Sequence, residues 1–431
     1  MITSFKKTFL YVLLVALVYI GVLWSWLQYS VISAFKYWDE VYALSCIPIL
    51  ILSYKKSFFS KEDIRLTVYL CLFSIAGIVG NIITKCATLQ AAISDLFLNI
   101  KFFMALFATT YLFRKQDIRK YNNRIKIHIR FLTIVFICLF LIDRLIHIFP
   151  VYEVRFGIMS EQLIFVHPTF CAAAMFYLIL LNITFCGIKN LLDKISLLFL
   201  CIIVVMTLRF KAIATVLFFV ALYFFIHYKI LRSFRWAIIA LTITAVMIIA
   251  YDQVAFYFSG YGLDHFARGA LLTTGIKIMR DYFPFGTGFA TFGSYMSGVY
   301  YSPIYAEYGI STIGGIAKHD INAITDQYWP MIMGQTGVIG LSFMILCWGE
   351  MYKKIRRFRK RNNDFYIVGL SCFVYIILSS TSESAVCNPA CFPFAILLGI
   401  VFSQKVNLRG DSHESKSNCT LSASISPCSS K

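Results

Sequence analysis

The feature that most constrains this chain is a succession of apolar runs, most of them close in length to a membrane-spanning helix. A helix needs about 20 predominantly apolar residues to cross the hydrocarbon core of a bilayer. Because a helix satisfies its own backbone hydrogen bonds in lipid, we expect an all-α fold, a polytopic transmembrane helical bundle of about 12 helices. The runs cover residues 8–28, 37–54, 64–84, 92–113, 131–149, 164–186, 195–208, 212–227, 236–251, 330–350, 366–380 and 390–404.

Composition agrees with this fold class. The chain is 59% hydrophobic and only 14% charged, with a mean hydropathy of +0.74, whereas soluble domains carry about 25% charged residues. The runs divide the chain into transmembrane helices 1–9 (1–251), a large loop (252–328) and transmembrane helices 10–12 (329–408). The Ser-rich tail, 409–431, is predicted to be disordered and cytoplasmic.

The net charge of +19 follows from the predicted topology. With the N-terminus in the cytoplasm, 29 of the 40 Lys and Arg residues fall in predicted cytoplasmic segments. This is the positive-inside distribution of a membrane protein, so the charge indicates contact with membrane lipid and no nucleic-acid partner. The same topology places the 252–328 loop outside the cytoplasm.

Cations that break this distribution are candidates for function, because charge at membrane depth is costly. Arg209 and Lys211 interrupt a predicted outer turn, where lipid-interface snorkelling is the alternative interpretation. Arg268 and Arg280 belong to a second cluster in the loop. Arginine binds phosphate oxygens through paired hydrogen bonds, which favours a phosphate-bearing substrate. The eleven cations are Lys36, Lys85, Lys101, Arg144, Arg155, Arg209, Lys211, Arg268, Lys277, Arg280 and Lys318.

The second cluster is predicted to lie on a helix over 264–281. Asp264 can cap it, and Pro284 follows its end. We expect its apolar face to consist of Leu272, Ile276 and Met279. On a helical period Arg268 and Lys277 point to opposite faces, and we assign Arg268 to the functional one.

Two residues of the loop are candidate general bases. Asp326 is either a base or the N-cap of the helix that follows it. His319 is either a base or an ordinary loop histidine. The aromatic stretch YYSPIYAEYGI (300–310) is expected to pack the loop, with sugar stacking as the alternative. No nucleotide-binding loop or metal-ligand spacing is visible in the sequence, so we expect no metal and no cofactor.

Several motifs occur in a characteristic order. A basic turn, LRFKAIA (208–214), precedes R-G-A at Arg268, D-x-x-P-x-G-x-G starting at Asp281, and Asp326, eleven residues before the G-x-x-G that starts at Gly337. His167–Pro168 lies upstream. In these motifs and in topology, the chain resembles the bacterial O-antigen ligase and O-antigen polymerase superfamily, at motif level over roughly 200–345.

The resemblance implies an enzyme of the bacterial inner membrane, a multi-pass membrane glycosyltransferase whose site faces the periplasm. Its substrate would be an undecaprenyl-pyrophosphate-linked glycan, with the pyrophosphate held by Arg268, Lys211 and Arg209, and with Arg280 as a further candidate. Ligases of the family usually have His at the position of Asp326, which favours a polymerase in O-antigen or capsule polysaccharide biosynthesis. A ligase acting on the lipid A core of lipopolysaccharide and a glycolipid flippase are the alternatives. A flippase and a chain-length regulator would be partner proteins.

Overall fold

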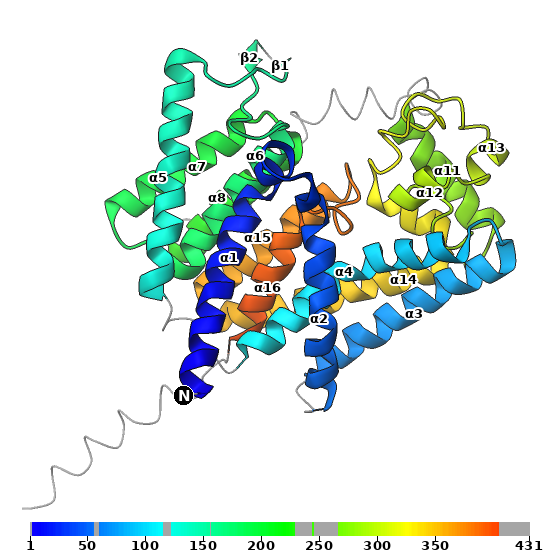
Figure 1. Cartoon of the computed structure of the whole chain (residues 1–431), viewed down its shortest axis with the longest axis horizontal. Helices are drawn as coiled ribbons and strands as arrows, with labels where there is room; N and C mark the ends of the chain where they lie inside the picture. Colours follow the sequence, from blue (N-terminus) through cyan, green and yellow to red (C-terminus); the bar gives the residue numbers. More distant parts are fainter. Residues whose placement is uncertain are drawn as a thin grey trace, which may run out of the picture.

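The computed structural model describes residues 2–55, 60–114, 122–155, 157–228, 244 and 266–404. The chain is mostly helical, with 74% of the described residues in helices (Figure 1). A two-stranded antiparallel sheet is formed by β1 (Val154–Arg155) and β2 (Ile158–Met159), in which Val154 pairs with Met159.

The helices before the large loop correspond closely to the predicted apolar runs. They are α1 (Ile2–Ser30), the 3₁₀ turn η1 (Ser33–Tyr37), α2 (Trp38–Lys55), α3 (Lys61–Thr84), α4 (Leu89–Phe113), α5 (Asn122–Ile146), α6 (Pro168–Leu181) with the π-turn η3 (Asn182–Cys186), α7 (Leu191–Met206) and α8 (Phe210–His227). The remaining helices are α11 (Ala267–Asp281), α12 (Tyr295–Val299), α13 (Ile304–Glu307), α14 (Tyr328–Arg356), the 3₁₀ turn η5 (Arg357–Lys360), α15 (Asn363–Ser379) and α16 (Phe392–Ser403).

Seven helices in the described part of the chain are long and apolar enough to cross a membrane. They span Thr8–Ser30, Lys61–Thr84, Leu89–Phe113, Asn123–Ile146, Pro168–Cys186, Phe210–His227 and Tyr328–Lys360. These helices indicate a membrane-embedded protein, while a count of about twelve crossings stays a prediction. The predicted run 236–251, the start of the loop with Asp264, and the tail 409–431 lie outside the described residues.

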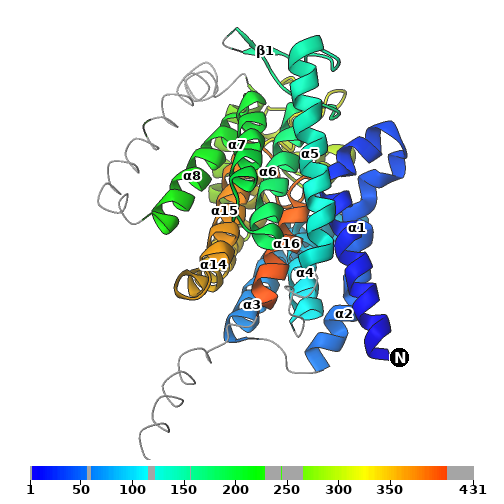
Figure 2. The same ribbon diagram turned by 90° about the vertical axis from the view of Figure 1, so that its left-hand side faces the viewer.

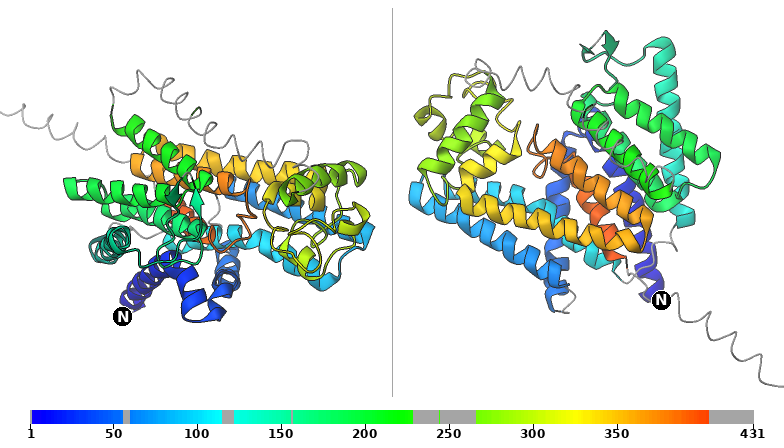
Figure 3. Two further views of the ribbon diagram at one scale, coloured as in Figure 1. Left: turned by 90° about the horizontal axis from the view of Figure 1, so that it is seen from above. Right: turned by 180° about the vertical axis from the view of Figure 1, so that it is seen from behind.

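The helices pack in two groups. The long helix α14 packs against α3 and α11, and α4 packs against α2 and α16. On the other side α6 packs on α7, and α8 packs on α15 (Figures 1 and 2). Helix α16 is almost entirely buried, as its uniformly apolar sequence requires. The short helices α11, α12 and α13 gather above α3, α4 and α14 (Figures 1 and 3).

The D-x-x-P-x-G-x-G motif docks onto a kink in α14. Gly337 leaves helical geometry (φ 60°, ψ −162°), so nearby backbone groups lose their partners within the helix. The motif replaces those partners, because the N–H groups of Thr287 and Gly288 donate to the carbonyls of Gly334 and Gln335 at 2.9 and 2.8 Å. A Cβ on Gly288 (φ +97°) would lie 2.4 Å from the backbone of α3, so this position requires glycine.

Helix α11 starts at Ala267 and uses a different apolar face from the predicted one. Leu271, Thr274 and Ile278 are buried, whereas Ile276 is exposed, so the predicted stripe was out of register. The physical reason is close packing on α14. Gly275 is the contact point, and a Cβ there would lie 2.8 Å from the carbonyl oxygen of Pro330.

Candidate functional site

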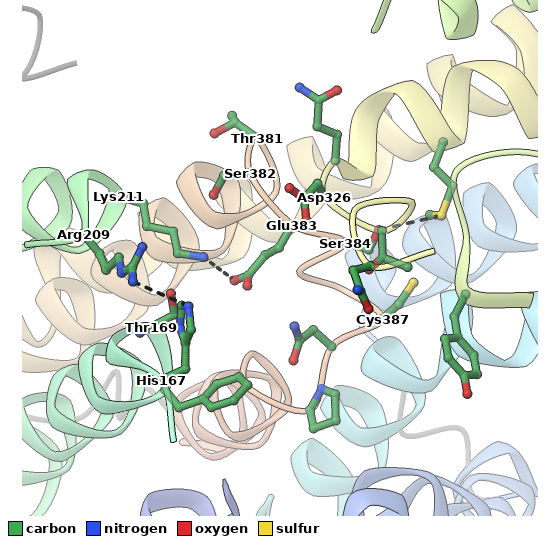
Figure 4. Close-up of a pocket in the computed structure, with 18 of the residues that line it drawn as sticks. His167, Thr169, Arg209, Lys211, Asp326, Thr381, Ser382, Glu383, Ser384 and Cys387 are labelled. Carbon is green, nitrogen blue, oxygen red and sulfur yellow. Dashed lines mark hydrogen bonds and ion pairs between the residues drawn. The ribbon is translucent and has the colours of Figure 1, made fainter. Parts of the chain in front are cut away.

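A cavity of about 1450 Å³ opens where the loop helices meet the bundle. Its walls come from η1, α2, α4, the start of α6, the α7–α8 turn, α11, α12, the start of α14 and the α15–α16 connection (Figure 4). Segments that are far apart in the sequence therefore contribute to one site.

Six of the eleven cations that break the positive-inside distribution line this cavity. They are Lys36, Lys101, Arg155, Arg209, Lys211 and Arg268. Four carboxylates also line it, namely Glu40, Asp95, Asp326 and Glu383. Cations thus outnumber carboxylates on the walls, which favours an anionic ligand.

Arg209 lies in the turn before α8, at the cavity wall. Its guanidinium is 2.7 Å from Glu153, and that carboxylate also holds Arg155 at 3.1 Å. The ring of Tyr152 lies 5.5 Å from the Arg209 guanidinium carbon. Burial is the main influence on Arg209 and lowers its pKa, and its Nε–H has no hydrogen-bond partner within the described ranges. Such a donor is suited to an added acceptor.

His167 caps α6 and faces Arg209. Its Nδ1 accepts a hydrogen bond from the Thr169 N–H at 3.1 Å. Burial first, and then the neighbouring positive charges, lower its pKa to about 4, so the ring is neutral near pH 7 and carries its proton on Nε2. That nitrogen lies 3.5 Å from the Arg209 guanidinium (Figure 4). Two donors face each other there, and an oxygen between them would accept from both.

Arg268, at the start of α11, forms an ion pair with Asp326. Arg268 Nε donates to Asp326 Oδ2 at 3.0 Å, and the side chains are 26% and 31% exposed. Burial raises the pKa of Asp326, and Arg268 partly offsets this effect. The N-cap of α14 is Gln327 rather than Asp326, so the capping alternative for Asp326 does not apply.

A second ion pair lies beside the first. Lys211 Nζ is 2.8 Å from Glu383 Oε1, and both side chains are largely buried. Glu383 lies between Lys211 and Asp326 (Figure 4), close enough to Asp326 to contribute to raising its pKa. Sequence reasoning missed Glu383 and Glu153. The available signal was the presence of carboxylates in connections between predicted helices, and the sequence does not show which cations they pair with.

Two of the predicted site residues lie elsewhere. Arg280 is 78% exposed, pairs with the adjacent Asp281 at 3.0 Å, and does not line the cavity. His319 is exposed and also lies away from the cavity wall. The structure therefore brings together Arg209, Lys211, Arg268 and Asp326, but it does not bring Arg280 or His319 to them.

The aromatic stretch 300–310 packs the loop. Tyr305 is fully buried, and its hydroxyl accepts from the Gly293 N–H at 2.9 Å. Over the residues for which the structure gives positions, no cluster of His, Cys, Asp and Glu could hold a metal ion. Comparison of the sequence with models of known families gives no match, and comparison with curated protein sequences gives none either.

Proposed function

We propose that this protein is a membrane glycosyltransferase that polymerises oligosaccharide units carried on undecaprenyl pyrophosphate. The observation that carries the proposal is the meeting of Arg209, Lys211 and Arg268 in one cavity, with side chains that are 14%, 13% and 26% exposed. Phosphate oxygens are the ligands that best match several guanidinium and ammonium donors at one site. A lipid-linked phosphate would reach such a cavity from the membrane in which the helices lie.

In the proposed reaction, a hydroxyl oxygen of the acceptor sugar attacks the anomeric carbon of the donor. A new C–O bond forms, and the bond from that carbon to the pyrophosphate oxygen breaks. The electron pair leaves with the pyrophosphate, and the hydroxyl proton passes to a carboxylate. The fixed positive groups stabilise the charge that develops on the leaving group, in a site where little reorganisation is required.

Asp326 is the proposed proton acceptor, with Glu383 as a second carboxylate beside it. Each is held by a cation, Asp326 by Arg268 and Glu383 by Lys211. Phosphate binding would compete for those cations. Release of the carboxylates would then leave a base available when the donor is bound.

The neutral Nε2–H of His167 and the adjacent Arg209 would donate to one phosphate oxygen. In the neutral ring of His167, Nδ1 accepts from the Thr169 N–H and Nε2 carries the proton, so neither nitrogen is free to accept the proton of the sugar hydroxyl. Its proposed role is therefore hydrogen-bond donation to the leaving group.

Reconstitution tests the proposal. The purified protein in lipid nanodiscs is incubated with undecaprenyl-pyrophosphate-linked oligosaccharide extracted from the source organism after deletion of the gene. A polymerase gives longer glycans on the same carrier and releases undecaprenyl pyrophosphate. A ligase transfers the glycan only when a separate acceptor is added, and a flippase forms no new glycosidic bond. Transfer that depends on an added acceptor, or no new bond at all, would overturn the proposed polymerisation.

A further inference from the structure

We propose that the half of the cavity formed by η1, α2, α4 and α12 binds neutral sugar rings and holds the acceptor glycan. The inference rests on the proposed function, because it assigns the second substrate of that reaction. It concerns a different wall from the one that carries Arg209, Lys211 and Arg268.

The volume leaves room for two reactants. Sites for single small molecules usually enclose about 300–1,000 Å³, whereas this cavity encloses about 1450 Å³. Its two walls also differ in chemistry. Arg209 experiences the charges of Arg155 and Arg268, whereas Lys36 of η1 interacts with Tyr37 and Tyr295.

Two exposed tyrosines line this half of the cavity. Tyr37 of η1 is 51% exposed, and Tyr295 of α12 is 58% exposed. By contrast, Tyr305, one helix further along, is fully buried in the loop core. Tyrosine offers an apolar ring face together with a polar hydroxyl. Sugar rings present C–H faces and hydroxyl groups, so they match both parts of this side chain.

A carboxylate with spare accepting capacity lies among these rings. Glu40 lines the cavity and is 3.6 Å from the buried ammonium group of Lys101. Asp39 binds the same ammonium group more closely, at 2.6 Å. Because Asp39 already neutralises Lys101, Glu40 keeps its oxygens for other donors, and a carboxylate can accept from several sugar hydroxyls.

Gln327, which follows Asp326 and is the N-cap of α14, provides an independent sign of a polar ligand in the cavity. It lines the cavity, is 5% exposed, and its Oε1 has no hydrogen-bond partner among the residues that the structure describes. A buried acceptor without a donor is costly, and a ligand hydroxyl would satisfy it. Lys36 and Glu40 lie on this wall with opposite charges that offset each other, and the exposed rings beside them favour a neutral polyhydroxylated ligand.

The test separates sugar binding from lipid-pyrophosphate binding. Calorimetry of the full-length protein in nanodiscs uses two probes, undecaprenyl pyrophosphate and the free oligosaccharide released from the carrier by mild acid. We expect Tyr295→Ala and Glu40→Gln to weaken oligosaccharide binding by at least about tenfold and to change undecaprenyl pyrophosphate binding by less than about twofold. Tyr300→Ala is the matched control, because Tyr300 is exposed at the other end of α12 and does not line the cavity.

Each outcome has a defined meaning. Unchanged oligosaccharide affinity in Tyr295→Ala and Glu40→Gln overturns the acceptor site. So does loss of oligosaccharide binding in Arg268→Ala alone, because the sugar would then occupy the cationic wall. If wild-type protein binds undecaprenyl pyrophosphate but no oligosaccharide, the acceptor site fails and the proposed donor site stands. If it binds neither probe, the proposed function itself fails. Retained undecaprenyl pyrophosphate binding in the variants shows that they are folded.

Discussion

Arg268 Nε lies 3.0 Å from Asp326 Oδ2, so a cation at the start of α11 meets a carboxylate just before α14. The two residues are 58 positions apart in the sequence. The contact follows from packing of α11 along α14, with Gly275 set against Pro330. One ion pair thus joins Arg268, the proposed phosphate-binding residue, to Asp326, the proposed base. A substrate phosphate that binds Arg268 would therefore weaken its ion pair with Asp326.

Replacing Arg268 tests the phosphate site. We expect Arg268→Ala to reduce polymer synthesis by at least about a hundredfold with normal protein levels, because a transition-state charge contact is lost. Arg268→Lys should restore only part of the activity, since the ammonium cannot form the paired bonds of a guanidinium. Product analysis of membranes containing each variant measures this effect.

Arg280→Ala and Lys277→Ala are the controls for Arg268. Both side chains are exposed on α11 and lie outside the cavity, so each variant should retain near wild-type activity. If either control abolished synthesis while Arg268→Ala remained active, the cavity would not be the phosphate site.

Replacing the two carboxylates identifies the base. Asp326→Asn keeps the shape of the side chain but cannot accept a proton near pH 7, so we expect a glycan ladder to collapse to single repeat units on a gel. Glu383→Gln should have a smaller effect if Glu383 mainly positions Lys211. A full-length ladder from Asp326→Asn with none from Glu383→Gln would transfer the role to Glu383. Long glycan stranded on the carrier lipid after gene deletion would indicate a ligase.

The pH profile follows from the environment of Asp326. Burial raises its pKa above the usual value of 3.8, with Glu383 contributing, while Arg268 and Lys211 lower it. A base works only when deprotonated, so activity should fall as the pH decreases through this raised pKa. Arg268→Lys provides a weaker hydrogen bond to the carboxylate, and its acidic limb should move to higher pH. An unchanged limb in the residual activity of Arg268→Lys would mean that another group titrates.

The apolar runs predicted most helices of the described chain, because helix length and membrane thickness are physically coupled. The predicted distribution of Lys and Arg across the membrane was equally informative about the site, since six of the cations that depart from it line one cavity. The face of α11 was mispredicted because packing of Gly275 on Pro330, rather than side-chain hydrophobicity, decides it. Such close approaches depend on a partner helix that the local sequence does not reveal.

The carboxylates of the site were harder to foresee than its cations. Glu383 lines the cavity from the α15–α16 connection, and Glu153, just before β1, pairs with the lining residue Arg209. Their significance depends on which cation lies opposite, and that is a property of tertiary structure. Arg280 was a further candidate beside Arg268, but it lies twelve positions later in the sequence, and of the two only Arg268 lines the cavity.

Labelling tests the topology. Helix α14 has 29 residues, a length of about 43 Å, and joins the cavity to the basic segment 353–361. In a background without native cysteines, a membrane-impermeant maleimide applied from outside should label Thr312→Cys and spare Asn363→Cys. Both positions are exposed in the structure. Labelling of both from the same side would overturn the orientation.

Two ion pairs of α14, one with α3 and one within α14, give a stability prediction that is independent of function. Lys354 binds Asp63, and both side chains are largely buried, whereas Lys353 binds Glu350 with its own side chain 63% exposed. Lys354→Ala leaves the Asp63 carboxylate buried without its cation, which should cost about 3 kcal/mol of the free energy of unfolding. Lys353→Ala removes an exposed partner of Glu350, which retains Arg65 at 2.8 Å, and should cost less than about 1 kcal/mol. Thermal unfolding in detergent compares the two variants, and equal destabilisation would contradict the assignment of a buried pair at Lys354.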